Sequence, residues 1–174
     1  MIRKATAADI DAIESIYDHI HSAEERGEAV IGWGRGVYPV RATALAALER
    51  GDLFVQTEDE TGKAVGTAIL NQVQVDVYAG APWEWDVPDE QVMVMHTLVI
   101  DPREKSRGYG AAFARYYEQY AVQNGCRYLR IDTNERNAAA RRFYEKMGYR
   151  EVCIRPCVFN GLPGVNLVLL EKKL

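Results

Sequence analysis

The stretch that decides the fold is residues 96–112, which read His-Thr-Leu-Val-Ile-Asp-Pro-Arg-Glu-Lys-Ser-Arg-Gly-Tyr-Gly-Ala-Ala. An apolar run of strand length ends at Asp101-Pro102, and a basic turn with two glycines then opens a helical pattern. The first N–H groups of a helix have no partner inside it, and the helix dipole favours negative charge there. Gly108 and Gly110 let the backbone come close to a phosphate. Positive charge is added by Arg103, Lys105 and Arg107. The stretch predicts a phosphate or pyrophosphate cradle, although glycines in such a turn can also serve geometry alone.

Strand and helix patterns alternate on both sides of this stretch. The expected strands span residues 2–5, 53–57, 64–77, 91–100, 127–132, 149–155 and 165–171. The expected helices span residues 10–20, 39–50, 108–124 and 137–147. The order β-α-α-β-β-β-α-β-α-β-β predicts an α+β (α/β-like) fold in a single domain over residues 1–174. The β-α-β-α-β run in its second half favours locally parallel pairing.

Length and composition exclude several classes of protein. The chain has 174 residues, of which 48% are hydrophobic and 26% are charged, so it can bury a full core. Disordered, collagenous and coiled-coil structures do not fit this composition. A formal net charge of -4 gives no support for nucleic-acid binding through bulk charge. The longest apolar runs have the length of strands, and no membrane span is expected.

The cysteines and histidines suggest a compartment rather than a metal site. The three cysteines have no C-x-x-C spacing, and the first residues contain no apolar leader segment. A cytoplasmic protein with reduced thiols is therefore expected. The three histidines and three cysteines also lack the spacing of metal ligands, so no metal is expected.

A second motif begins about 27 residues after the glycine turn and one predicted strand later, at Asn137-Ala-Ala-Ala-Arg-Arg-Phe-Tyr-Glu-Lys-Met-Gly-Tyr. Together the two segments resemble the GNAT superfamily of acyl-CoA-dependent N-acyltransferases. The pyrophosphate motif of that family, Arg/Gln-x-x-Gly-x-Gly/Ala, corresponds here to residues 105–110. Lys105 departs from this motif at its first position. A lysine keeps the positive charge of an arginine but lacks its planar fork of N–H donors.

The resemblance implies a fold, a co-substrate and roles for individual residues. The implied fold is a mixed central sheet of six to seven strands flanked by about four helices, and the implied co-substrate is acetyl-CoA. Backbone amides of the family's central strand, which line the pantetheine arm and the acetyl group, fall on Leu98, Val99 and Ile100. The pyrophosphate loop falls on Lys105, Ser106, Arg107, Gly108, Tyr109, Gly110 and Ala111. The amide side chain that meets the pantetheine arm falls on Asn137, and the tyrosine that protonates the leaving thiolate falls on Tyr144.

This chemistry also calls for a general base. Backbone N–H groups can stabilise the oxyanion that forms when an amine attacks a thioester, and a tyrosine can protonate the thiolate. An alkyl ammonium is mostly protonated at pH 7, which costs roughly 4 to 5 kcal/mol unless a base helps. Candidates for the base are His96, Glu84, Asp86 and Glu90. His96 can alternatively be a histidine that is hydrogen-bonded within the sheet. Glu84 is flanked by Trp83 and Trp85, and such aromatic surroundings could raise the pKa of its carboxylate. The alternative for Glu84 is a carboxylate in a solvated loop.

The predicted function is an N-acetyltransferase that transfers the acetyl group of acetyl-CoA to a primary amine by direct attack in a ternary complex. Two other classes stay open, namely a non-catalytic acyl-CoA-binding sensor module and a nucleotide-binding domain that uses the turn at Gly108 and Gly110. Replacing Tyr144 by Phe, or comparing CoA with ATP and NAD as ligands, would separate these classes.

The predicted partner is a small-molecule amine, with a protein amine as the alternative. The net negative charge weakly favours a cationic small molecule. Two aromatic loops, residues 33–38 with Trp33 and Tyr38 and residues 83–85, are expected to frame the acceptor. No nucleic-acid or membrane partner is expected. A homodimer is a further option, because the final strand, residues 165–170, could pair across a sheet edge.

Overall fold

The computed structural model describes all 174 residues, and the chain forms two compact units. Unit 1 comprises Met1–Ala29, Trp33–Leu70 and Thr97–Tyr116, and unit 2 comprises Val30–Gly32, Asn71–His96 and Tyr117–Leu174. Strand β4 (Val92–Ile100) and helix α3 (Tyr109–Gln123) each begin in one unit and end in the other. The seven strands follow the order β1-β2-β3-β4-β5-β7-β6 in one sheet, and the chain has four α-helices. The expected fold class is confirmed.

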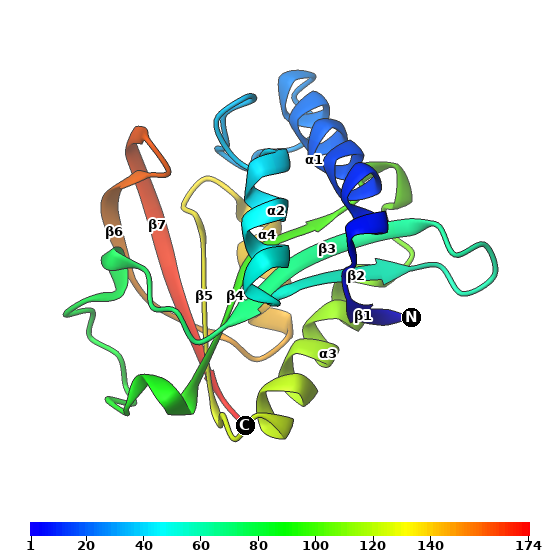
Figure 1. Ribbon diagram of the computed structural model, residues 1–174. Coiled ribbons are helices and arrows are strands. Elements are labelled where there is room, and N and C mark those ends of the chain that lie inside the picture. The colour runs from blue at the N-terminus through cyan, green and yellow to red at the C-terminus, as the bar shows by residue number, and fades with distance from the viewer. The chain divides into compact units, whose positions relative to one another are not determined.

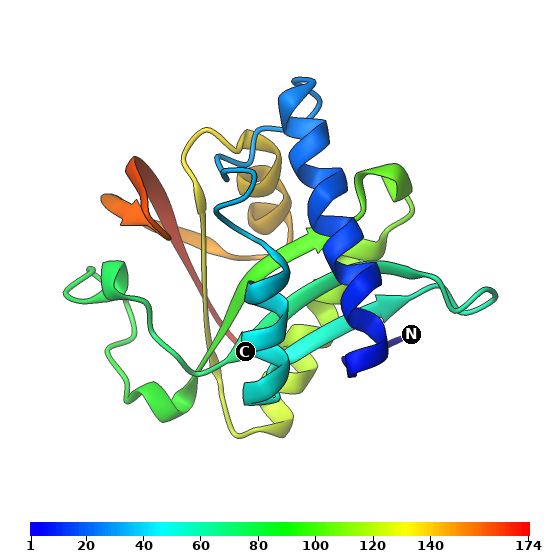
Figure 2. The same ribbon diagram turned by 45° about the horizontal axis from the view of Figure 1, so that its top comes forward.

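Unit 1 contains an antiparallel group of strands with two helices on one side. Its strands are β1 (Ile2–Lys4), β2 (Leu53–Thr57) and β3 (Ala64–Asn71), and its helices are α1 (Ile10–Glu25) and α2 (Arg41–Arg50). β2 pairs antiparallel with both β1 and β3. Both helices lie on the same face of these strands (Figure 1 and Figure 2). The strands and helices therefore form two layers that bury one apolar stripe of each helix.

Local sequence explains how these two helices begin, pack and end. The helix expected over residues 10–20 forms, and the apolar side chains that recur along one of its faces, Ile10, Ile13, Tyr17 and Ile20, are all buried. Ahead of α1, the Asp9 carboxylate accepts a hydrogen bond from the Thr6 backbone N–H at 2.8 Å, which is the reciprocal half of a capping box. α2 ends where Gly51 adopts a left-handed conformation with φ 75°, directly after the helix expected over residues 39–50.

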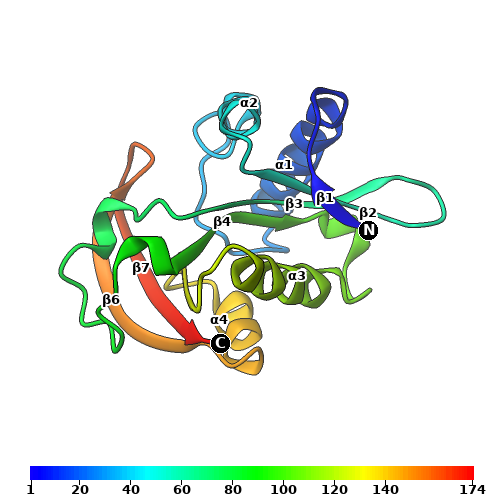
Figure 3. The same ribbon diagram turned by 60° about the horizontal axis from the view of Figure 1, so that its bottom comes forward.

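Unit 2 contains the strands and the helix that follow α3, together with the first half of β4. They are β5 (Tyr128–Asn134), α4 (Ala138–Lys146), β6 (Arg150–Phe159) and β7 (Leu162–Lys173). β4 pairs parallel with β5, which confirms part of the expected parallel pairing, whereas β7 pairs antiparallel with both β5 and β6. β6 and β7 run side by side as a long hairpin (Figure 3). β7 comes after β6 in the chain and lies between β5 and β6.

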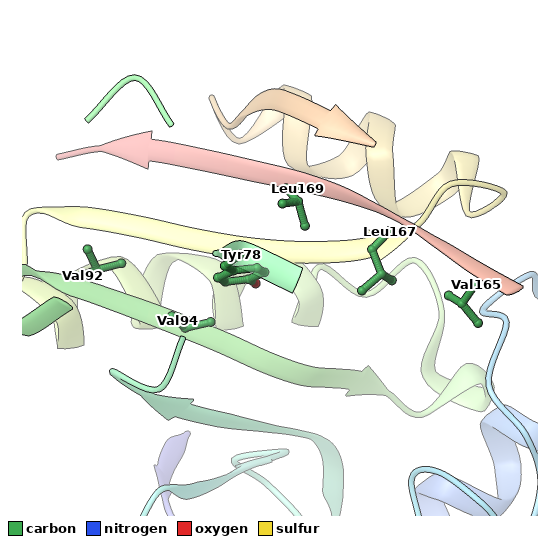
Figure 4. Packing of buried hydrophobic residues seen from close by; sticks show 6 residues of the cluster. All are labelled: Tyr78, Val92, Val94, Val165, Leu167 and Leu169. Atoms are coloured by element: carbon green, nitrogen blue, oxygen red, sulfur yellow. The ribbon is translucent and has the colours of Figure 1, made fainter. Parts of the chain in front are cut away.

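One face of unit 2 is an apolar cluster under a loop. The cluster is formed by Tyr78, Val92, Val94, Val165, Leu167 and Leu169. Figure 4 shows the Tyr78 ring over β5, with the valines of β4 on one side and the leucines of β7 on the other. Tyr78 comes from a single 3-10 turn, η2 (Asp76–Tyr78), in the segment between β3 and β4. This segment therefore covers the sheet rather than joining it.

Two sequence expectations about strands are wrong. The strand predicted over residues 64–77 ends at Asn71. The valines that follow Asn71 belong to the loop, where Val75 and Val77 pack on the apolar cluster and Val73 is exposed. The final strand is not a sheet edge, because β7 is paired on both of its sides and β6 is the edge strand instead. The turn at Asn160-Gly161 returns β7 to the inside of the sheet.

No helix of the chain is both long and apolar enough to span a membrane.

Candidate active site

The second half of β4 carries a backbone irregularity at Thr97. Thr97 has φ 53°, a left-handed value that is unusual for a β-branched residue and that is found more often at functional sites. The parallel pairing of β4 with β5 covers Val92–Val94 only, so the amides of Leu98, Val99 and Ile100 are not engaged in it. These three residues are the ones predicted to line the pantetheine arm. Such a disturbed strand can present its amides to a ligand.

The loop before α2 contacts this irregularity. The Tyr38 hydroxyl is in short hydrogen-bond contact with the Thr97 hydroxyl. Trp33 packs against the Tyr38 ring edge to face, with the ring centroids 5.8 Å apart. The predicted aromatic loop of residues 33–38 is therefore fixed beside β4 within unit 1. Tyr38 is thus held by a residue far away in the sequence, and Trp33 is held by Tyr38.

The turn after β4 is anchored by a buried carboxylate. Asp101 is 1% exposed and accepts hydrogen bonds from the Arg103 backbone N–H at 3.0 Å and from Arg103 Nη2 at 2.8 Å. His19 Nδ1 of α1 lies 3.1 Å from the Asp101 carboxylate. Burial alone would raise the pKa of Asp101, but the hydrogen bonds from Arg103 and the charge of His19 outweigh it and lower this pKa. Asp101 therefore ties the start of the turn to α1.

The basic side chains of the turn are largely occupied by protein groups. Arg107 donates to Glu58 at 2.6 Å and to Glu104 at 2.7 Å, and Lys105 Nζ donates to the Glu28 carbonyl at 3.3 Å. Arg103 is held by Asp101, as described above. The positive charges of Arg103 and Arg107 are thus offset by carboxylates within the protein, whereas Lys105 meets only a carbonyl. Besides Lys105, the turn offers mainly backbone N–H groups to an anion.

The backbone of the turn fits a pyrophosphate. Ser106 and Gly108 have φ values of 64° and 79°, and no atom lies within 4 Å of the position that a Cβ on Gly108 would take. The Ala112 N–H donates to the Gly108 carbonyl at 3.0 Å, so the N–H groups before it, including that of Gly110 in the first turn of α3, have no helical partner. The open Cβ position of Gly108 thus lies directly before the amide end of a 15-residue helix, the end that favours an anion. Acetyl-CoA, the co-substrate implied by the resemblance, carries such a pyrophosphate.

The second predicted motif lies in unit 2. Asn137 precedes α4 and caps it, because its Oδ1 accepts a hydrogen bond from the Ala140 N–H at 3.1 Å. Its side-chain oxygen is therefore used by the helix, and its NH₂ group is the part that can donate to a pantetheine arm. The first helical residue is Ala138, one later than predicted.

Tyr144 is buried in α4 with a hydroxyl that makes no hydrogen bond within the protein. Its ring packs edge to face against Phe143 and Tyr149, with centroid distances of 5.1 Å and 5.6 Å. Burial, and then the negative charge of Asp132, raise the pKa of Tyr144 well above its usual value. The hydroxyl is thus protonated at neutral pH and has no protein acceptor for its proton.

The candidate bases from the sequence have other partners. His96 Nε2 lies 2.9 Å from Asn71 Oδ1, an oxygen that also accepts from the Val73 N–H, so His96 donates here. The Glu84 side chain is 52% exposed and forms an ion pair with Arg150 at 3.1 Å. The predicted aromatic enclosure of Glu84 does not form. Asp86 and Glu90 are exposed.

The two tryptophans beside Glu84 turn toward the strands. Trp83 packs against Tyr78 at a centroid distance of 5.3 Å, and the Arg130 guanidinium lies 4.2 Å from a Trp83 ring centroid. Trp85 packs against Tyr128 at 6.0 Å. The predicted wall of residues 83–85 is therefore part of the cover over β5 in unit 2.

Sequence reasoning missed one carboxylate on β5. Asp132 is half-buried and accepts a hydrogen bond at 2.8 Å from the Tyr78 hydroxyl. Burial raises its pKa to about 6, against the lowering effect of the Tyr78 hydrogen bond. A signal was present in the sequence, because β5 alternates buried Leu129 and Ile131 with Arg130 and Asp132, which places both charged residues on one face. The structure contains no group of three or more His, Cys, Asp or Glu side chains arranged to hold a metal ion.

Comparison with known proteins shows the family of the chain. Residues 13–149 match the acetyltransferase (GNAT) family. The uncharacterized N-acetyltransferase YhfO of Bacillus subtilis (strain 168) is 24% identical over 150 residues, covering 86% of this chain and 89% of YhfO.

Solved structures show the same fold. A GNAT-family acetyltransferase from Streptococcus agalactiae 2603 aligns with a TM-score of 0.80 and 21% identity, covering 100% of this chain and 95% of that chain. The structure of yncA from Salmonella typhimurium, with its cofactor acetyl-CoA, aligns with a TM-score of 0.69 and 19% identity over 100% and 93% of the two chains. The family match extends over most of the sequence and includes both motifs. The chain therefore belongs to the acetyltransferase (GNAT) family and is an acyltransferase.

Proposed function

We propose that residues 1–174 form a single acetyltransferase domain that transfers the acetyl group of acetyl-CoA to a primary amine by direct attack in a ternary complex. The observation that carries this proposal is the turn before α3. There, Ser106 and Gly108 have positive φ values, the Cβ position of Gly108 is open, and the first N–H groups of α3 have no helical partner. The first motif of the family, residues 105–110, lies in this turn, and the second begins at the N-cap of α4.

The proposal assigns a binding task to each part of the site. Acetyl-CoA supplies a thioester carbonyl that an amine can attack. The pyrophosphate would be held by the backbone of residues 105–111, and the pantetheine arm by amides of residues 98–100 and by the NH₂ group of Asn137. Amides at a developing oxyanion typically contribute on the order of 3 kcal/mol each to lowering a barrier.

Tyr144 is the proposed proton donor to the thiolate. Its support is the hydroxyl that makes no hydrogen bond within the protein and that stays protonated at neutral pH. The roles predicted for His96 and Glu84 as bases stay predictions, and their observed partners, Asn71 and Arg150, give them no added support.

The acceptor is proposed to be a small-molecule amine, with a protein amine as the alternative. Trp33 and Tyr38, fixed beside β4, would form one wall of its pocket. A cytoplasmic location is proposed, and the thiols of Cys126, Cys153 and Cys157 are all free, as in a reducing compartment. A homodimer stays a prediction, for which the available sheet edge is β6.

Thermal melts with acetyl-CoA, CoA, ATP and NAD in parallel test the co-substrate. At one hundred times the dissociation constant a ligand adds about 2.7 kcal/mol of stability, which corresponds to a rise in Tm of roughly 5 to 11 °C for a chain of this size. We expect this rise with acetyl-CoA and CoA, and none with ATP or NAD. The absence of a shift with either CoA compound at millimolar concentration would contradict the proposal.

A matched pair of glycine variants tests whether the turn holds the co-substrate. Gly108 and Gly125 stand just before and just after α3, both with positive φ and both with open space around the Cβ position. Gly108→Ala and Gly125→Ala should therefore lose similar stability, on the order of 1 kcal/mol each. Only Gly108→Ala should also lose most of the melting shift with acetyl-CoA. Equal shifts in the two variants would count against the turn as the pyrophosphate site.

A further inference from the structure

Asp132 lies on the face of β5 that the segment between β3 and β4 covers. It pairs across the strands with Leu169 of β7, so both side chains lie on the same face of the sheet. That face carries the apolar cluster containing Tyr78 and Leu169. A carboxylate at the side of an apolar cluster has few groups to stabilise its charge.

The Asp132 carboxylate has one hydrogen-bonding partner in the protein, and the residue as a whole is not fully buried. The Tyr78 hydroxyl donates to Oδ2 at 2.8 Å, and the residue is only half-buried. An aspartate used purely to hold the fold would be expected to have an arginine or lysine partner, as Asp101 has in Arg103. Asp132 has no such partner.

The neighbours of Asp132 are acids that are neutral at pH 7. They come from three different elements, with Tyr78 on η2, Tyr144 on α4 and Cys157 on β6. Burial, and then the charge of Asp132, raise the pKa of Tyr144 and of Cys157. Asp132 is therefore the group of this cluster that gains and loses a proton near neutral pH.

Nearby positive charges on the same face are committed elsewhere. Arg155 of β6 donates to the Gly80 and Ala79 carbonyls of the covering segment. Arg130, two residues before Asp132, donates to Gln74 Oε1 at 2.9 Å and lies against Trp83. Neither arginine forms an ion pair with Asp132, so its carboxylate stays more basic than an ordinary aspartate.

This arrangement couples a base to an acid. While Asp132 is charged, its field makes Tyr144 a weaker acid. Once Asp132 has taken up a proton its charge is gone, and Tyr144 becomes a stronger acid at the stage at which a leaving thiolate needs a proton. The order of events suits an acyl transfer, in which the amine loses a proton and the thiolate gains one.

We propose that Asp132 is the general base that takes the proton from the acceptor amine, and that Tyr78 is a positioning residue that holds its carboxylate. The proposal rests on the proposed function. An N–H bond of the substrate ammonium breaks, its electron pair stays on nitrogen as the attacking lone pair, and the proton goes to a carboxylate oxygen of Asp132. The resulting carboxylic acid later returns this proton to solvent.

Three variants test the proposal with two readouts, one of which does not depend on activity. Asp132→Asn removes the base, Tyr78→Phe removes only the hydrogen bond, and Asp76→Asn is a matched control, since Asp76 is an exposed carboxylate in the same 3-10 turn as Tyr78. The first readout is a ¹³C NMR titration of the aspartate carboxyl carbons in the protein alone. We expect a signal with a midpoint near pH 6 that is absent in Asp132→Asn, shifted upward in Tyr78→Phe and unchanged in Asp76→Asn.

The second readout is the pH profile of acetyl transfer to whichever of spermidine, tyramine, lysine and an alanyl peptide the wild type acetylates fastest. The wild-type profile should fall below about pH 6, because Asp132 must be ionised to accept a proton. In Tyr78→Phe this limb should move to higher pH, because the lost hydrogen bond stabilised the charged form. Asp132→Asn should lose the limb and roughly a hundredfold in kcat/KM.

Folding of the variants is checked by the melting shift with acetyl-CoA, which all three should keep.

The free energy of unfolding should also depend on pH in the wild type. Burial raises the pKa of Asp132 in the folded protein above that of an unfolded aspartate, so the folded protein loses stability as pH rises from about 4 to about 6. Asp132→Asn should not show this loss of stability. A wild type that acetylates none of the four amines would overturn the proposed function and the base together. An active wild type whose Asp132→Asn variant keeps its rate and its acidic limb, or a titration midpoint near 4, would overturn the base alone.

Discussion

Replacing Tyr144 by Phe is expected to lower kcat by roughly 10²- to 10⁴-fold, the range typical for the loss of a general acid. The hydroxyl makes no hydrogen bond within the protein, so its removal leaves no buried group without a partner. The ring contacts with Phe143 and Tyr149 are kept by a phenylalanine. Stability and affinity for acetyl-CoA should therefore stay close to those of the wild type, and steady-state kinetics with thermal melts would show the separation.

The matched control for this variant is Tyr149→Phe. Tyr149 packs against Tyr144 in the same aromatic group and is similarly buried, but it has no assigned part in the chemistry. It should keep turnover within a few-fold of the wild type. Full turnover by Tyr144→Phe would contradict its role as proton donor. A wild type that binds acetyl-CoA and never turns it over would instead favour the sensor-module alternative.

Replacing Asp101 by Ala is expected to reduce the free energy of unfolding by about 3 kcal/mol and to weaken acetyl-CoA binding on the order of tenfold. The carboxylate is almost completely buried, and its loss would leave Arg103 and the His19 ring without their shared partner. The Tm should fall by roughly 6 to 12 °C. Binding should weaken because Asp101 fixes the start of the turn that leads to Gly108.

The contribution of Asp101 should also depend on pH, with a definite sign. Its pKa in the folded protein is lower than usual, because the Arg103 hydrogen bonds and the His19 charge outweigh burial. Its contribution is therefore complete above the pKa of an unfolded aspartate, about 4, and is lost as pH falls through the lower folded value. Denaturant unfolding at pH 7 and at pH 3 would measure the difference.

Asp11→Ala is the control for that experiment. Asp11 also meets an arginine, since Arg41 Nη1 lies 2.7 Å away, but its side chain is 88% exposed. Exposed pairs contribute about 0 to 1 kcal/mol, so this variant should be nearly neutral at both pH values. Comparable losses in Asp11→Ala and Asp101→Ala would contradict the special position given to Asp101.

Elements defined by neighbours in the chain could be predicted from sequence. The apolar spacing of α1, the left-handed Gly51 after α2 and the glycine turn before α3 all depend on residues within a few positions of each other. Each of these features is present where the sequence predicts it. The valines of residues 73–77 show the limit of the same reasoning, because packing on the apolar cluster produces the same alternation as a strand.

Contacts between distant residues could not be predicted in this way. The Tyr38–Thr97 contact joins residues 59 apart, and the Tyr78–Asp132 hydrogen bond joins residues 54 apart. Neither pair has a local signature, because the partners meet only after the strands have paired. The same holds for Glu58, which offsets the charge of Arg107 from a position 49 residues away. The family motifs therefore predict the cradle and the role of Tyr144, but they do not point to the carboxylate proposed as the base.

The measurement that tests the central claim most directly is mass spectrometry of one reaction mixture containing the protein, acetyl-CoA and the panel of primary amines. We predict that CoA and the acetylated amine form in equal amounts, and only when an amine is present. The protein mass should stay unchanged with acetyl-CoA alone, as direct attack in a ternary complex requires. Release of CoA without an acetylated amine, no release with any amine, or an acetylated protein that passes its acetyl group on would contradict the account.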